Sequence, residues 1–148
     1  MEKVVHTQLQ HKSAGDSAVS GLFTGLLGGL AMALVIVLFS LLAGQGISFL
    51  GYFSTGTPAS PLLGLLMHLA VSSIYGMLYA LVRRWTGIDR SQRLPGWLSG
   101  LVYALVLWLF AVTVLLPAAH SLMLTLPWPV FFSGHVAYGL VLGWRQRS

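Results

Sequence analysis

The sequence of 148 residues contains no cysteine and little charge, with eight Lys and Arg and three Asp and Glu. The absence of cysteine excludes disulfides, thiolate metal sites and cysteine nucleophiles. A soluble domain is about one-quarter charged, because its surface must be solvated, whereas 7% of this chain is charged and 56% is hydrophobic. Most of its surface must therefore face lipid or other protein, and we expect an integral membrane protein.

Charge is absent from two long stretches, residues 17–82 and 94–144. Because about 20 helical residues cross the hydrocarbon core, each stretch has room for two spans and a turn, and clusters of glycine and proline indicate the turns. The predicted fold is an all-α membrane protein, a bundle of four transmembrane helices. The predicted spans are about 17–43, 61–82, 95–116 and 127–144, preceded by a cytoplasmic N-terminal head, 1–16.

The positive charges are distributed asymmetrically along the chain. Two lysines precede the first predicted span, four arginines lie between the second and third spans, and two arginines follow the fourth. The other two connections, 44–60 and 117–126, contain no Lys or Arg. By the positive-inside rule, both termini are cytoplasmic in a multi-pass protein of the inner (plasma) membrane. Charges confined to the span ends also indicate the lipid bilayer, and not nucleic acid, as the partner of this basic chain.

Small residues recur at intervals of four along the predicted helices, so that they share one face of each helix. In lipid, such grooves let helix backbones approach closely. The two halves of the chain carry similar patterns with two helices each, which predicts two helical hairpins related as parallel repeats. The glycines predicted to pack the helices are Gly21, Gly25, Gly29 and Gly76 in the first half and Gly96, Gly100, Gly139 and Gly143 in the second.

The second helix of each half also carries a histidine ahead of a Tyr-Gly pair. The motif residues are His68-Leu69, Ser72 and Gly76, then Trp108, Pro117 and Gly134-His135-x-x-Tyr138-Gly139-x-x-x-Gly143. With this pattern the chain resembles an uncharacterised family of small bacterial four-helix membrane proteins with a duplicated hairpin, in which a Gly-rich helix precedes a His-x-x-x-Ser/Gly-x-x-x-Gly helix. The resemblance covers about residues 17–145 and implies no established activity.

The two histidines are the residues best suited to bind a ligand. His68, Ser72 and Tyr75 share one face of the second helix, and His135 and Tyr138 share one face of the fourth. Counted from the proline near the start of each helix, both histidines lie roughly 10 Å from the outer end. We therefore expect these five residues to form a candidate ligand-binding site between the second and fourth helices.

Three interpretations of His68 and His135 stay open. Each histidine could hydrogen-bond a tyrosine, a serine or a carbonyl across helices and so stabilise the packing. Level rings on parallel helices could instead be the axial ligands of haem b, although the outer half offers no Lys or Arg for the propionates. Finally, they could hydrogen-bond a quinone-like or other small apolar ligand. Two histidines are too few for a zinc site, so no metal is expected outside the haem alternative.

Two functions are consistent with these features. No carboxylate lies inside a span to orient a histidine, so we expect no enzyme activity. The favoured hypothesis is a non-catalytic accessory subunit or scaffold. It would pack against partner membrane proteins, or against another copy of itself, through its small-residue seams and the apolar outer loop 44–60. That loop could also lie in the outer headgroup layer. The second hypothesis is a small ligand-binding or transport bundle that uses His68 and His135.

Overall fold

The structure is a computed structural model that describes residues 13–44, 46–53, 60–87 and 95–145. These ranges contain helices and no β-strand, which confirms the predicted all-α class. The long helices are α1 (Ala14–Leu42), α2 (Pro61–Thr86), α4 (Gly96–Phe110) and α6 (Trp128–Arg145). The short elements are the 3-10 helices η1 (Ser48–Phe53) and η3 (Leu122–Thr125), the π-helix η2 (Ala111–Leu115) and α5 (Leu116–Ala118).

Three helical segments are long and apolar enough to cross a membrane. They are α1, α2 and the continuous segment Gly96–Ala118, in which η2 and α5 extend α4. The fourth, α6, has 18 residues, which corresponds to about 27 Å at 1.5 Å per residue, slightly less than the roughly 30 Å of the hydrocarbon core. The three longer segments give the chain its membrane-like character, and the shorter α6 packs alongside them.

The first helix begins at Ala14 rather than at residue 17, because a capping box precedes it. The Ser13 hydroxyl accepts a hydrogen bond from the Asp16 N–H at 3.1 Å, and the Asp16 carboxylate accepts one from the Ser13 N–H at 2.9 Å. This reciprocal pair satisfies two N–H groups that a helix start leaves unpaired. The end of the predicted head therefore belongs to α1, and its residues 1–12 lie outside the described residues.

The second helix is also longer than predicted. It starts at Pro61, where the missing N–H of proline costs nothing, and the Ser60 hydroxyl accepts a hydrogen bond from the Leu63 N–H at 3.3 Å. It continues to Thr86 and ends at Gly87, whose φ of 66° is the left-handed conformation that commonly ends helices at glycine.

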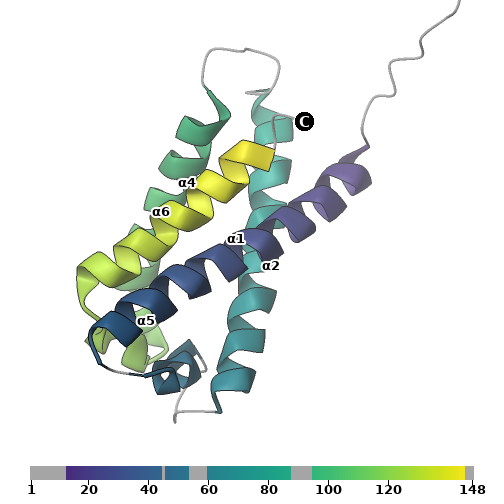
Figure 1. Cartoon of the computed structure of the whole chain (residues 1–148). Coiled ribbons are helices and arrows are strands. Elements are labelled where there is room, and N and C mark those ends of the chain that lie inside the picture. Colours follow the sequence, from purple (N-terminus) through teal and green to yellow (C-terminus); the bar gives the residue numbers. More distant parts are fainter. Residues whose placement is uncertain (1–12, 45, 54–59, 88–94, 146–148) are drawn as a thin grey trace, which may run out of the picture.

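The long helices alternate in direction (Figure 1). The start of α1, the end of α2, the start of α4 and the end of α6 lie at one end of the molecule, which we call the basic end because Arg83 and Arg84 are there. The opposite end, which holds η1 and η3, is called the far end. α1 packs against both α2 and α6, and α6 packs against α4.

Glycines bring α1 and α2 so close that backbone meets backbone. A Cβ atom placed on Gly21 would lie 2.7 Å from the Gly76 carbonyl oxygen, and one on Gly25 would lie 2.9 Å from the Gly76 Cα. A Cβ atom on Gly29 would lie 2.6 Å from the Cβ of Ser72. Such distances leave no room for a side chain, so these glycines pack α1 against α2 within the first hairpin.

The second hairpin packs by the same means. A Cβ atom on Gly139 would lie 2.6 Å from the Gly100 carbonyl oxygen, and one on Gly100 would lie 2.8 Å from the Gly143 nitrogen. A Cβ atom on Gly143 would meet the Gly96 carbonyl oxygen and lie 2.6 Å from the Trp97 Cα. All eight glycines predicted to pack the helices therefore contact another helix of the same chain.

A third close contact, between α1 and α6, was not predicted. A Cβ atom on Gly28 would lie 2.7 Å from the Tyr138 ring. One on Gly134 would lie 3.0 Å from Ile36 and 3.1 Å from Met32. This contact joins the two hairpins, so that α1 and α6 form the centre of the bundle.

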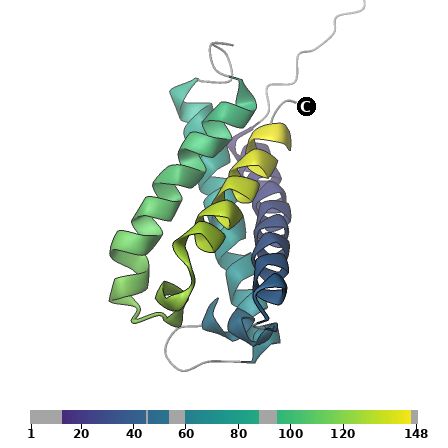
Figure 2. The same cartoon turned by 60° about the vertical axis from the view of Figure 1, so that its left-hand side comes forward.

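The outer helices α2 and α4 meet near the basic end and diverge toward the far end (Figure 2). Where they meet, the Tyr79 hydroxyl shares a 2.8 Å hydrogen bond with the Ser99 hydroxyl, and the Tyr103 hydroxyl donates to the Tyr75 carbonyl oxygen at 2.8 Å. The rings of Tyr79 and Tyr103 also touch, with their centres 5.0 Å apart. Toward the far end, the space between α2 and α4 is bordered by η1 and η3.

The segment η1 folds back against the bundle. Phe49 and Leu50 are 3% and 8% exposed, and the Leu50 carbonyl oxygen lies where a side chain of Gly64 on α2 would be. Part of the apolar loop expected in the headgroup layer or at a partner is thus buried in its own chain. Residues 54–59 of that loop lie outside the described residues.

Candidate functional site

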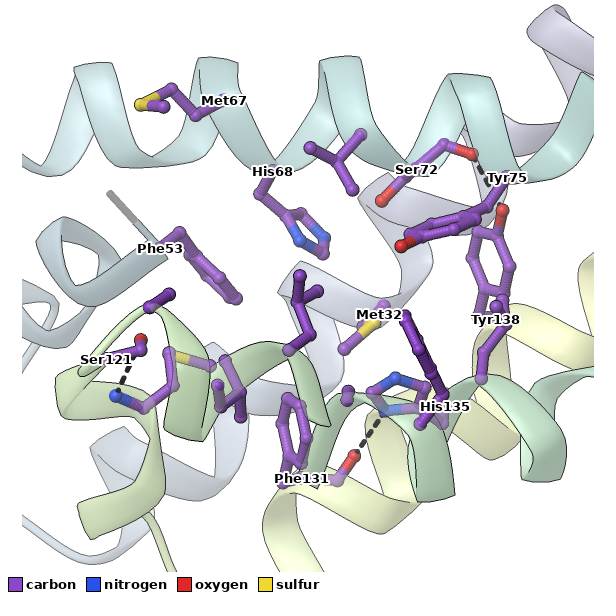
Figure 3. Close-up of a pocket in the computed structure, with 18 of the residues that line it drawn as sticks. Met32, Phe53, Met67, His68, Ser72, Tyr75, Ser121, Phe131, His135 and Tyr138 are labelled. Carbon is purple, nitrogen blue, oxygen red and sulfur yellow. Dashed lines mark hydrogen bonds between the residues drawn. The ribbon is translucent and has the colours of Figure 1, made fainter. Parts of the chain in front are cut away.

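A cavity of about 240 Å³ lies where α2 and α4 diverge. Its walls come from α1, α2, the segment from α4 to α5, α6 and the two 3-10 helices. Figure 3 shows the side chains that surround it. All five residues predicted to bind a ligand line this cavity: His68, Ser72, Tyr75, His135 and Tyr138.

The imidazole of His68 is held in one orientation by α1 and η1. Its Nε2 lies 3.1 Å from the carbonyl oxygen of Gly29, which the close α1–α2 contact brings within reach. The Phe53 ring stacks on the face of the imidazole, with ring centres 4.3 Å apart and planes inclined by 28°. His68 is 8% exposed, so the ring is buried, with the Gly29 carbonyl oxygen at its edge and the Phe53 ring against its face.

His135 is held by its own helix. Its Nδ1 lies 2.9 Å from the carbonyl oxygen of Phe131, one turn earlier in α6. The Phe131 ring meets the imidazole edge-on, with ring centres 4.6 Å apart. His135 is also 8% exposed.

These hydrogen bonds determine which ring nitrogens carry hydrogen. A carbonyl oxygen can only accept, so His68 Nε2 and His135 Nδ1 must be the donors. A neutral imidazole has a single N–H, and therefore His68 Nδ1 and His135 Nε2 are acceptors. Neither acceptor has a hydrogen-bond partner among the residues that the structure describes. The site thus combines two unused acceptors with a largely apolar wall.

The other predicted ligand residues divide into two roles. The Tyr138 hydroxyl donates to the Ser72 carbonyl oxygen at 2.7 Å, so it joins α6 to α2. The Tyr75 ring lies between those of His68 and Tyr138 (Figure 3). The hydroxyl groups of Tyr75 and Ser72 form no hydrogen bond with any described residue, and they add two donors to the cavity wall.

One side of the cavity is bordered by exposed apolar side chains. Met67 and Val71 on α2 are 37% and 44% exposed, and Phe110 and Leu115 across the gap are 44% and 39% exposed. None of the described residues that line the cavity is Asp, Glu, Lys or Arg. A side chain that is both at a cavity wall and exposed marks the mouth, so the cavity opens between α2 and α4 on an apolar surface.

The wall formed by the third long segment owes its shape to a wide turn that the sequence did not predict. In η2, the Leu116 N–H bonds to the Ala111 carbonyl oxygen, five residues earlier. Pro117 follows directly and has no N–H to continue the α-helical pattern, which favours such a local adjustment. Ala111 and Leu115 from this turn both line the cavity. The residue that indicates this turn is Pro117, which the sequence pattern assigns to the connection 117–126.

Other lining residues also escaped prediction. Met32, Phe53 and Phe131 border the cavity, and they come from an inner helix, a loop and the first turns of α6. No charged residue lies near any of them in the sequence, so nothing distinguishes them from lipid-facing residues. A search for aromatic residues one helical turn before a histidine would have found Phe131.

The haem alternative does not fit this cavity. An apolar cavity of about 150 Å³ holds one benzene molecule, so about 240 Å³ admits one substituted ring and not the four pyrroles of a haem. No lining side chain is a cation that could pair with propionates. In addition, the described residues contain no group of three or more His, Cys, Asp or Glu suited to a metal ion.

Comparison with known proteins identifies a family for this chain. No curated protein and no solved structure is detectably similar to the chain. One family matches residues 15–147, which include all four long helices almost completely and every residue of the cavity. The chain therefore belongs to this family, described as a family of unknown function (DUF6789).

Proposed function

We propose that this protein is a non-catalytic binding protein of the inner membrane that takes a small lipid-soluble molecule into the cavity between α2 and α4. The observation that carries the proposal is the joint position of His68 and His135, which line one largely apolar cavity and each keep one acceptor nitrogen without a partner among the described residues. Ligand sites in proteins are typically apolar concavities with a few convergent polar groups, and this cavity has that character.

The proposal includes four spans with both termini in the cytoplasm. α6 packs along α1 and α4, so lipid around its neighbours would surround it too. The basic end carries Arg83 and Arg84, and the positive-inside rule then places it in the cytoplasm. The far end, with η1 and η3, faces outward. The cavity accordingly lies in the outer half of the bilayer.

The mouth of the cavity determines where the ligand comes from. It is bordered by exposed Met67, Val71, Phe110 and Leu115, which face lipid if the spans are as proposed. A molecule dissolved in the outer leaflet can enter sideways, whereas a polar solute from the aqueous phase meets no charged residue there. Binding or carriage of a lipid-soluble molecule is therefore the function that this geometry favours.

The scaffold hypothesis receives less support. It requires small-residue seams that face outward toward another chain, but a Cβ atom on Gly25, Gly76, Gly100 or Gly139 would meet backbone of the same chain. The outer faces of the helices instead carry large apolar residues such as Leu34 and Val106. Such faces suit lipid, and they offer no groove for a close helix–helix contact.

The test is photolabelling of the full chain in lipid vesicles with a phenol that carries a diazirine on a decyl chain. We expect labelled peptides to contain cavity residues of α2, η2 or α6. Ala111→Phe, at a buried cavity position, should abolish this labelling. Ala118→Phe is the matched control, because Ala118 is exposed and does not line the cavity. Labelling confined to lipid-facing residues, and equal in both variants, would refute the proposal.

A further inference from the structure

The arrangement of donors and acceptors selects among lipid-soluble ligands. His68 and His135 come from two different helices, and each offers the cavity a ring nitrogen that can only accept. Reversing either tautomer would replace a hydrogen bond to a backbone carbonyl oxygen with two lone pairs that face each other, which is unfavourable. The site is therefore prepared for a ligand with two hydrogen-bond donors.

The shape and lining of the cavity favour a single aromatic ring. A cavity of roughly 150 Å³ accommodates benzene. The volume of this cavity is about 240 Å³, which leaves additional space for substituents on the ring. Phe53, Tyr75 and Phe131 line it, and aromatic side chains pack favourably on a ligand ring in offset or edge-on geometry. The apolar mouth beside Met67 and Phe110 leaves a path for an alkyl or isoprenoid tail into lipid.

We infer that the ligand is a lipid-tailed aromatic diol of the hydroquinone class, whose two hydroxyl groups donate to His68 Nδ1 and His135 Nε2. This inference rests on the proposed function, because it requires that the cavity binds a ligand from the membrane. The hydroxyl groups of Tyr75 and Ser72 lie on the same wall and can donate to the lone pairs of the bound diol oxygens.

The same geometry disfavours the oxidised quinone. A quinone has carbonyl oxygens, which accept and cannot donate, so its oxygens would face the lone pairs of two imidazole nitrogens. Tyr75 and Ser72 could donate to the quinone oxygens, but His68 Nδ1 and His135 Nε2 would stay without a hydrogen-bond partner. Leaving acceptors unpaired on binding is a common basis of discrimination between related ligands. The site therefore prefers the reduced, hydrogen-bearing form.

The experiment is competition for the photolabel in vesicles containing the full chain, under nitrogen. The competitors are decylhydroquinone, decylbenzoquinone and the dimethyl ether of decylhydroquinone, which share a tail and a ring and differ in donors. We expect the hydroquinone to compete at roughly tenfold lower concentration than either analogue, the factor expected from two neutral hydrogen bonds. His135→Phe removes one acceptor and should reduce this preference severalfold, whereas Tyr75→Phe, which removes a donor, should preserve it.

The outcomes separate the inference from the proposed function. If the quinone or the dimethyl ether competes as well as the hydroquinone, or if none of the three competes, the inference is wrong while cavity labelling still supports a ligand site. If the photolabel itself does not reach the cavity, the proposed function fails first. The comparison among three ligands uses the unaltered protein, so it does not depend on whether a variant folds.

Discussion

Gly76→Ala should destabilise the bundle, although alanine is the better helix former. A Cβ atom at this position would meet the Gly25 Cα and lie 2.5 Å from the Gly21 carbonyl oxygen. Both are backbone atoms, so neither can rotate away and α1 must move from α2. That movement also lengthens the 3.1 Å hydrogen bond between His68 and the Gly29 carbonyl oxygen.

The size of the effect follows from opposing terms. Overpacking costs about 1–3 kcal/mol, and weakening one buried hydrogen bond adds about 1 kcal/mol. The gain in helix propensity from glycine to alanine is about 1 kcal/mol. We therefore expect Gly76→Ala to lower the free energy of unfolding by about 2 kcal/mol.

The assay is SDS-titrated unfolding in mixed micelles, followed by circular dichroism. Gly15→Ala is the matched control on α1, because a Cβ atom there meets the Ser13 hydroxyl at an ordinary 3.5 Å. Gly15 is the second residue of α1, so the substitution should raise stability by at most about 1 kcal/mol, from propensity alone. If the two variants shift the free energy of unfolding in the same direction, or differ by less than about 1 kcal/mol, the close-contact account of the seam is refuted.

Three further substitutions test individual contacts of the site. Tyr138→Phe keeps the ring but removes its bond to the Ser72 carbonyl oxygen, so the free energy of unfolding should fall by about 1 kcal/mol; an unchanged SDS midpoint would contradict the role of that bond. Phe53→Ala removes the stack on His68, and half-maximal photolabelling should then require severalfold more probe, whereas an unchanged concentration would show that the stack does not position the ring. Pro117→Ala restores a backbone N–H after the wide turn, and the hydrogen bond it can form should raise stability by about 1 kcal/mol and reduce cavity labelling. A variant as stable and as strongly labelled as the wild type would disprove the proposed cause of the turn.

Much of the architecture was predictable because bilayer helices leave strong periodic signals. Two long stretches without charge indicated the apolar helices, and glycines four residues apart indicated the faces that pack. Gly25 and Gly76 illustrate the second signal, since each lies against the other. That the five candidate residues line one cavity was predictable for the same reason, since polar and small residues on one helical face point into a bundle rather than at lipid; their binding of a ligand stays a prediction.

The remaining features depend on contacts between distant segments. Phe53 comes from a loop whose apolar sequence suits a membrane interface as well as a bundle, and its contact with His68 requires the fold. The free volume between α2 and α4 exists because the tyrosines near the basic end hold these helices together while the far end diverges. No local pattern encodes such a gap. The direction of each histidine N–H likewise depends on which carbonyl lies nearby, as with Gly29.

The most direct test of the account is the protonation pattern of the two imidazoles, read by ¹⁵N solid-state NMR of histidine-labelled protein in lipid bilayers. We predict opposite tautomers, with hydrogen on Nε2 of His68 and on Nδ1 of His135. Adding decylhydroquinone should shift the His68 Nδ1 and His135 Nε2 resonances and leave exposed His120 unchanged. Identical tautomers, or an equal response from His120, would contradict the claim that two oriented acceptors form a ligand site.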